Sequence, residues 1–260
     1  MRIGSIHGSQ NSTKTMARQF ANAILNLRKK DILKISHFIH LRAEICSNNL
    51  NYELQRFGKS DRVGIVSFMD HTPGERQWRD IEKWRAFTIE RNSIGGLVLD
   101  DHYENLINIK AKYGSENETR VVAEATHLGA VLASHDDTTK EHVRSAARYG
   151  VRIAEFPTTL EASQNCRANN ISILLGAPNF IRGRSHSGNI SATALAEKDL
   201  LDILSSDYVP AALLNAAVKL GDLWGNLAKG LTTVTLAPAA AVGLKDRGAL
   251  RIGLHADFIL

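Results

Sequence analysis

The chain has 260 residues, of which 43% are hydrophobic, and it carries a formal net charge of +5. This length is enough for one large α/β domain with a sizeable core. Neither a basic block nor a nucleic-acid-binding motif is present, and no apolar stretch approaches a membrane span, so nucleic acid and membrane are excluded as expected partners. The two cysteines form no CxxC pair, which favours a reducing, cytoplasmic location.

The first half of the chain is expected to contain helices and strands in alternation. A helix is predicted over 15–30, a strand ending in HLRAEI within 32–45, a strand over 63–69 and a charged helix over 75–91. Residues 92–118 follow no regular pattern, and we expect an insertion there.

The second half continues the alternation. Thr138 and Glu141 resemble a capping box, and Gly150 is a typical helix end, so a helix is expected between them. The other predicted elements are a helix over 119–128, strands over 129–135, 151–156, 171–176 and within 200–210, helices near 191–198 and through 209–242, and the start of a β segment within 243–260. This order predicts a parallel sheet with crossover helices and about six or seven strands, fewer than the eight of a closed barrel.

Three predicted strands end abruptly in His or Asp, at His71, His135 and Asp207. In an α/β barrel, catalytic side chains converge at the C-terminal ends of the strands. Two imidazoles and a carboxylate from separate strands suit a divalent transition metal that activates water. Side chains alternate along a strand, so His40, Arg42 and Glu44 share one face.

Simpler roles are open for several of these residues. Asp207 follows two serines and could cap the next helix, and Glu44 could be the buried partner of Arg42. Asp136 and Asp137 fit a capping role better than a ligand role, because a helix is expected directly after them. The loop over 177–189, rich in Gly, Arg and Ser, could be a solvent-exposed turn.

Several long motifs, taken in order, resemble those of a known family. The motifs are MDHTPGERQ, ASHDDTT, AEFPTTLEA, GAPN followed after two residues by RG-x-SHSGN, and LLDILSSDYVPAALL. They are similar to the α-D-ribose 1-methylphosphonate 5-triphosphate diphosphatases of the amidohydrolase superfamily, which act in the carbon–phosphorus lyase route of phosphonate use. The likeness extends over almost the whole chain.

The resemblance implies a (β/α)₈ TIM-type barrel with divalent metal at its mouth, and a small β domain built from both chain ends. It implies Glu44, His71, His135 and Asp207 as metal ligands. Zinc is the first expectation for the metal, with manganese or iron as alternatives. Asp207 would also act in catalysis by accepting a proton from water.

The implied substrate is a ribosyl triphosphate, cleaved to a 5-phosphate and pyrophosphate. Transfer at phosphorus needs charge neutralisation more than covalent chemistry. The expected phosphate-binding residues are cations near the strand ends: Arg76, Arg182, Arg184 and His186. The oligomeric state stays open, homo-oligomers included.

The His-x-Asp or His-x-His pair of the family's first strand has no match here. We therefore expect an incomplete barrel over 1–242, the start of the return to the small domain over 243–260, and poor hydrolysis by this chain as given. Two rival hypotheses are a catalytically silent relative that binds an anionic ligand or a partner, and an amidohydrolase acting on a cyclic amide or a nucleobase.

Overall fold

The computed structural model describes residues 1–4, 16–92, 95–183 and 189–257. The chain forms two compact units, unit 1 over Met1–His135 and unit 2 over Asp136–Leu260. Within the described residues, no helix is long and apolar enough to cross a membrane.

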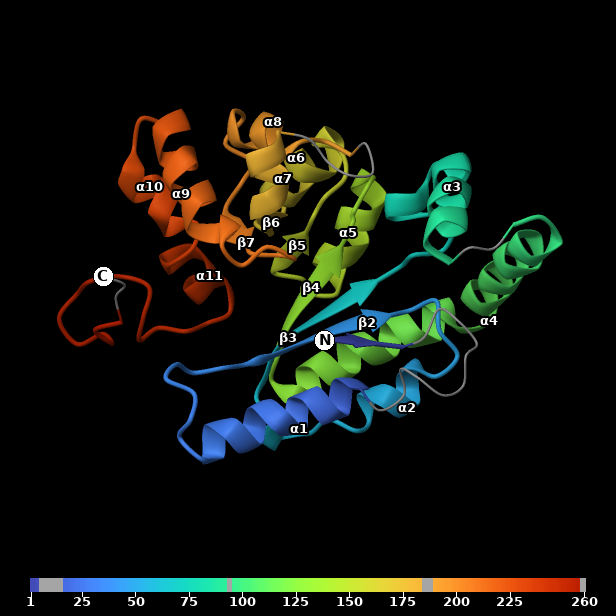
Figure 1. The fold of residues 1–260 in the computed structure, drawn as a ribbon, viewed down its shortest axis with the longest axis horizontal. Coiled ribbons are helices and arrows are strands. Elements are labelled where there is room, and N and C mark those ends of the chain that lie inside the picture. Colours follow the sequence, from blue (N-terminus) through green and yellow to red (C-terminus); the bar gives the residue numbers. More distant parts are fainter. Residues whose placement is uncertain (5–15, 93–94, 184–188, 258–260) are drawn as a thin grey trace. The chain divides into compact units, whose positions relative to one another are not determined.

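The strands of unit 1 are parallel and lie side by side in chain order (Figure 1). They are β1 (Arg2–Ile3), β2 (Ile39–Glu44), β3 (Val63–Met69) and β4 (Val131–His135). Arg42 of β2 lies opposite Ser67 of β3, and Ser67 lies opposite Ala133 of β4. Paired residues of neighbouring strands point to the same face of the sheet. The side chain of Arg42 therefore lies on the same face as those of Ser67 and Ala133. The strand predicted over 63–69 is confirmed at both ends.

The two faces of β2 differ in character. Leu41 and Ala43 are fully buried and belong to the hydrophobic core. Burial of a leucine side chain contributes about 2 kcal/mol. His40, Arg42 and Glu44 alternate with them and carry the polar groups, as the period of two predicts. The strand is therefore held by its core face, while its other face presents functional groups.

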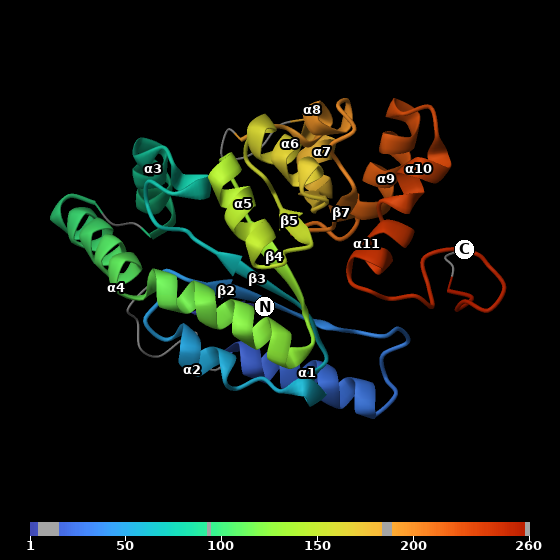
Figure 2. The same ribbon diagram turned by 180° about the vertical axis from the view of Figure 1, so that it is seen from behind.

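Helices and one-turn 3₁₀ helices connect the strands of unit 1. They are α1 (Met16–Lys29), α2 (Leu50–Leu54), η1 (Lys59–Asp61), η2 (Arg76–Trp78), α3 (Ile81–Asn92) and α4 (Leu97–Leu128). The helix predicted over 75–91 is divided between η2 and α3. Figure 2 shows α4 lying along the strands, where it packs against β3 and β4.

The insertion expected over 92–118 is wrong, because most of this segment belongs to the 32-residue helix α4. On the buried side of α4, Gly114 and Asn117 interrupt the apolar residues, so the sequence shows no continuous apolar stripe. Gly129 ends the helix with a φ of 69°, a left-handed conformation that glycine adopts without strain.

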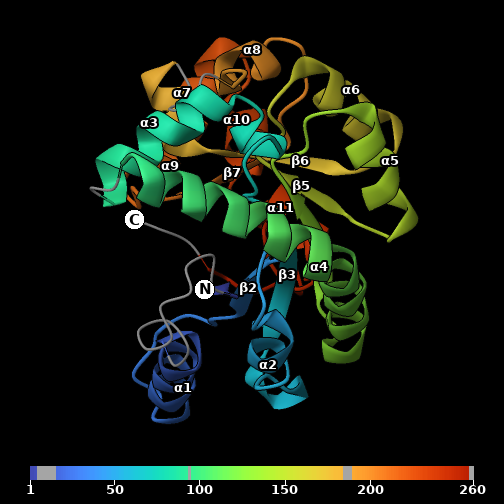
Figure 3. The ribbon, with the colours of Figure 1, turned by 90° about the vertical axis from the view of Figure 1, so that its right-hand side faces the viewer.

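Unit 2 contains three further parallel strands, with β6 between the other two. The elements are α5 (Lys140–Arg148), β5 (Ile153–Glu155), α6 (Leu160–Ala168), β6 (Ser172–Gly176), α7 (Ala177–Arg182), α8 (Ala192–Ala196), β7 (Ile203–Ser205), α9 (Ala212–Leu223), α10 (Leu227–Thr232) and α11 (Leu236–Ala241). Figure 3 shows α5 and α6 side by side, and they are in contact.

One detail of unit 2 corrects a sequence prediction. The cap of α5 is Thr139, whose side chain accepts a hydrogen bond from the backbone N–H of His142; Thr138, the expected cap, lies one residue earlier. Residues 243–257 form turns and irregular backbone, and the β segment expected within 243–260 stays a prediction, because residues 258–260 lie outside the described residues. The succession of strands and helices through both units is that of an incomplete (β/α)₈ barrel, as predicted.

Candidate metal site

Three predicted site residues of unit 1 stand at the C-terminal ends of neighbouring strands. Glu44 is the last residue of β2, His71 is the second residue after β3, and His135 is the last residue of β4. Parallel strands end at the same edge of a sheet, which explains why residues so far apart in sequence come together.

Glu44 is a fully buried carboxylate that holds His71 in place. Its Oε2 lies 2.6 Å from Nδ1 of His71 and accepts a hydrogen bond from the Arg2 guanidinium at 2.9 Å. Its Oε1 accepts from the backbone N–H groups of Cys46 and His71, at 3.3 and 3.2 Å. These contacts offset the cost of burying the charge. They also fix the ring of His71 so that Nε2 is the nitrogen directed away from the carboxylate.

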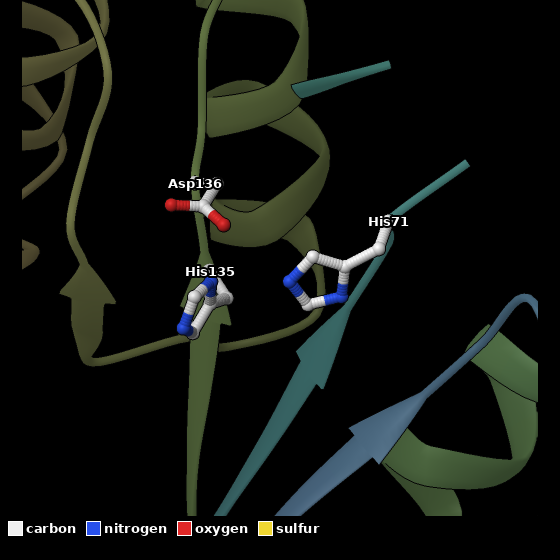
Figure 4. A group of neighbouring side chains, drawn as sticks. All are labelled: His71, His135 and Asp136. Atoms are coloured by element: carbon white, nitrogen blue, oxygen red, sulfur yellow. The ribbon is translucent and has the colours of Figure 1, made fainter. Parts of the chain in front are cut away.

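The rings of His71 and His135 lie next to each other at the ends of β3 and β4 and are tilted by 56° (Figure 4). Their centroids are 5.9 Å apart, and each ring offers a nitrogen within 4.8 Å of the other's. Two nitrogens bound to one ion at about 2 Å lie at most about 4 Å apart. The two nitrogens thus stand close to the separation that one metal ion requires.

Two arginines hold His135. The NH2 atom of Arg42 lies 2.7 Å from Nε2 of His135, and NH1 of Arg76 donates to the backbone carbonyl of His135 at 2.9 Å. Arg76 is buried, has a φ of 42° and lies over the ring of Phe68. Its guanidinium thus secures the end of β4, a role that sequence reasoning did not assign to it. The phosphate-binding role predicted for Arg76 stays a prediction.

A buried turn positions His71 from the other side. Oδ1 of Asp70 accepts hydrogen bonds from the backbone N–H of Thr72 at 3.1 Å and from its hydroxyl, and Oδ2 pairs with the Lys110 ammonium of α4. Burial alone would raise the pKa of Asp70, but the charge of Lys110, the hydrogen bonds from Lys110 and the Thr72 hydroxyl, and the charge of Arg76 hold that pKa below its ordinary value. The turn that carries His71 is therefore anchored to α4.

Asp136 is a residue that sequence reasoning set aside. It directly follows His135 and is drawn beside it in Figure 4. It is buried and has a φ of 55°, a left-handed conformation that is uncommon outside glycine. Because Thr139 caps α5, the capping role expected for Asp136 and Asp137 is filled by another residue. The sequence signal that could have pointed to Asp136 as a metal ligand is its position next to His135.

The remaining predicted site residues belong to unit 2. Asp207 is exposed after β7 with a φ of 49°, and it does not cap α9, whose N-cap position is Ala211. A Cβ added at Gly176 would stand 3.1 Å from Oδ2 of Asp207, so the glycine makes room for this carboxylate. Arg182 ends α7, and its guanidinium carbon lies 5.6 Å from the centre of the Tyr208 ring. Arg184 and His186 lie outside the described residues.

Comparison with solved structures gives modest similarity. An L-hydantoinase (dihydropyrimidinase) from Arthrobacter aurescens is 12% identical, with a TM-score of 0.45, over 91% of this chain and 63% of that one. An uncharacterized metal-dependent hydrolase from Pyrococcus horikoshii is 17% identical, with a TM-score of 0.38, over 54% of this chain and 35% of that one.

Sequence comparison is more informative. No protein-family model matches the chain. The alpha-D-ribose 1-methylphosphonate 5-triphosphate diphosphatase of Escherichia coli (strain K12) is 36% identical over 261 residues, which cover 99% of this chain and 69% of that protein. The motifs, the incomplete barrel and this identity agree, and the chain belongs to the family of alpha-D-ribose 1-methylphosphonate 5-triphosphate diphosphatases, which are hydrolases.

Proposed function

We propose that this chain carries the metal site of a diphosphatase that hydrolyses α-D-ribose 1-methylphosphonate 5-triphosphate to the 5-phosphate and pyrophosphate in phosphonate catabolism. The observation that carries the proposal is the His71–His135 pair, supported by buried Glu44 at the ends of neighbouring strands. Two imidazoles and a carboxylate suit a divalent ion, with zinc first and manganese or iron as alternatives.

The residues of unit 1 fit such an ion. His71 directs Nε2 away from Glu44, as metal-binding histidines do when a carboxylate holds their other nitrogen. When bound, a divalent ion supplies Lewis acidity, which makes a water molecule nucleophilic near neutral pH. His71 and His135 hold the ion in this proposal, and Glu44 orients His71. The ligand roles that the resemblance implies for Glu44 and Asp207 remain part of the proposal.

Asp207 takes the proton in the proposed reaction. Water attacks the phosphorus atom nearest the sugar, the bond from that phosphorus to the oxygen of the leaving pyrophosphate breaks, and Asp207 accepts the proton of the water and passes it to that oxygen. The exposed position of Asp207 supports this role, because a proton carrier must reach both water and substrate.

Cations around the site support an anionic substrate. Arg2, Arg42 and Arg76 of unit 1 surround Glu44 and His135. Arg182, with Arg184 and His186 beyond it in the sequence, is the proposed phosphate-binding set of unit 2. Guanidinium groups make strong, charge-assisted contacts to phosphate oxygens.

The test is an assay of the chain after removal of metal and reloading with one divalent ion at a time. Release of pyrophosphate is followed by phosphorus NMR, and bound metal is measured in the same samples. We expect His71→Ala and His135→Ala to lose the metal and whatever turnover the native chain shows, and His127→Ala, which changes an exposed histidine of α4, to keep the native values of both. Metal binding and turnover that survive in the first two variants would refute the assignment.

A substrate panel separates the rival activities. The ribosyl triphosphate, a cyclic amide and a nucleobase are offered to the same metal-loaded chain. Hydrolysis of the cyclic amide or deamination of the base, without release of pyrophosphate, would replace the diphosphatase proposal. Binding of the triphosphate without turnover would show a catalytically silent relative.

A further inference from the structure

Arg42 makes an unusual contact with a proposed metal ligand. It stands on β2, and its NH2 atom lies 2.7 Å from Nε2 of His135, 93 residues away at the end of β4. Ser67 is the register partner of Arg42 on β3, and its hydroxyl lies 2.9 Å from Nε2 of His40. His40 and Arg42, the two polar residues that precede Glu44 on the same face of β2, thus contact side chains of β3 and β4, respectively.

The chemistry of the two groups determines which nitrogen of His135 carries the proton. A guanidinium has five N–H donors and no acceptor, so Nε2 of His135 must accept with its electron pair. A neutral imidazole has one acceptor nitrogen, and therefore the proton of His135 is on Nδ1. The contact with Arg42 occupies the only electron pair through which this form of the ring could bind a metal ion.

Both routes to metal binding by His135 break this contact. Binding through Nε2 requires the electron pair that Arg42 holds. Binding through Nδ1 moves the proton to Nε2, where it would meet an N–H donor of Arg42. His71 differs, because its contact with Glu44 engages Nδ1 as a donor and leaves the electron pair of Nε2 for a ligand.

We propose that Arg42 and a divalent cation compete for His135, so that Arg42 is an internal cation that must be displaced when metal binds. This inference rests on the metal site proposed above. Arg42 is a positioning residue in the metal-free protein, where it holds the ring of His135. Once displaced, its guanidinium becomes a further cation that an anionic substrate could contact.

The competition implies a coupling between anions and metal. An anion that pairs with the displaced guanidinium stabilises the form in which His135 is available, so anion and metal each raise the affinity for the other. A triphosphate substrate is such an anion. The native chain is therefore expected to bind metal weakly without an anion and more tightly with one.

The test measures Co²⁺ affinity by its visible absorption in metal-free preparations of four proteins: the native chain, Arg42→Met, Arg120→Met and His135→Ala. Methionine keeps much of the length of the arginine side chain without its donors. We expect Arg42→Met to bind Co²⁺ about tenfold more tightly than the native chain, because one hydrogen bond from a charged donor no longer opposes the metal. Arg120 is an exposed residue of α4 paired with Glu116, and its variant controls for the loss of one positive charge.

A second measurement does not depend on metal. Nitrogen NMR of the metal-free native chain, labelled at histidine, should show His135 neutral with its proton on Nδ1, and one equivalent of Zn²⁺ should change this signal. Far-UV circular dichroism checks that each variant is folded. A His135 that is protonated, or that carries its proton on Nε2, in the metal-free native chain would overturn the proposal.

The outcomes distinguish this inference from the proposed function. In one outcome, the native chain binds Co²⁺, His135→Ala binds it more weakly, and Arg42→Met binds it no more tightly than the native chain. This outcome overturns the competition but supports the metal site. Equal tightening in Arg42→Met and Arg120→Met also overturns it, because charge alone would then explain the effect. Absence of binding in both the native chain and Arg42→Met overturns the metal site and the competition together.

Discussion

Glu44 and His71 are 27 residues apart in the chain, yet Oε2 of the carboxylate lies 2.6 Å from Nδ1 of the imidazole. The carboxylate is fully buried, and Arg2 contacts the same oxygen. A buried carboxylate that holds one nitrogen of a histidine directs the other nitrogen at a metal ion and raises its basicity. This pair gives the candidate site its most specific geometry.

The first prediction concerns this pair. Glu44→Gln keeps the shape of the side chain but removes its charge, so we expect affinity for Zn²⁺ to fall by about 10- to 100-fold, the range seen for such supporting residues. Competition with a chromophoric chelator measures the affinity. Glu116→Gln, on the exposed face of α4, should leave the affinity unchanged. Native affinity in Glu44→Gln would remove Glu44 from the site.

The second prediction concerns the anchor of the turn that carries His71. Lys110→Met removes the cation that pairs directly with the buried Asp70 carboxylate, and we expect the free energy of unfolding of unit 1 to fall by about 3–5 kcal/mol. Urea unfolding measures the loss. The double variant Asp70→Asn with Lys110→Met removes the charge as well, and it should recover part of the stability. A double variant as unstable as the single one would mean that Lys110 acts through packing.

The third prediction is a dependence on pH. Arg18 donates two hydrogen bonds to Asp61 at 2.6 and 2.7 Å, and these hold the pKa of Asp61 below its ordinary value of 3.8, although burial opposes them. A carboxyl group whose pKa is lower in the folded state stabilises the fold above its unfolded pKa, and this stabilisation is lost as the pH falls through the folded pKa.

Arg18→Met should therefore lower the free energy of unfolding at pH 7 by about 1–3 kcal/mol. The difference from the native chain should shrink as the pH falls below 3.8 and should vanish below the lower pKa of Asp61 in the folded chain. Urea unfolding at a series of pH values measures both effects. Lys83→Met, which removes an exposed ion pair with Asp80, should change stability by less than about 0.5 kcal/mol. A difference for Arg18→Met that does not change with pH would exclude the ion pair as its cause.

The fourth prediction concerns the packing of α9 against α10 in unit 2. A Cβ at Gly230 would lie 2.3 Å from the backbone oxygen of Ala217 and 2.5 Å from the backbone nitrogen of Gly221. Backbone atoms cannot move aside as a flexible side chain can. Gly230→Ala should therefore destabilise unit 2 by at least about 1 kcal/mol, although alanine favours helices by a similar amount. Thermal unfolding followed by circular dichroism measures the loss, and Gly58→Ala, with open space around it, is the control.

The sequence by itself predicted every strand except the two-residue β1, and it predicted the residues at the strand ends. β3 was predicted over its full length and β4 to its last residue, because an apolar, β-branched run that ends in a polar residue is a local signal. It also placed Glu44, His71 and His135 at strand ends, since their motifs follow those runs directly. Local patterns failed where burial is mixed: α4 carries Gly114 and Asn117 on its buried side and showed no helical stripe. Thr138 and Thr139 are adjacent and can both cap a helix, so the predicted N-cap of α5 was wrong by one residue.

Only the tertiary structure decided which residues contact one another in the site. Asp70 meets Lys110 across 40 residues, and Arg42 meets His135 across 93. Sequence patterns report preferences within a few residues, whereas these contacts depend on strand register and on the position of α4 against β3 and β4. A side chain of one strand reaches a group two strands away only when the register aligns them. The sequence alone therefore identified the histidines, and only the fold showed that an arginine holds one of them.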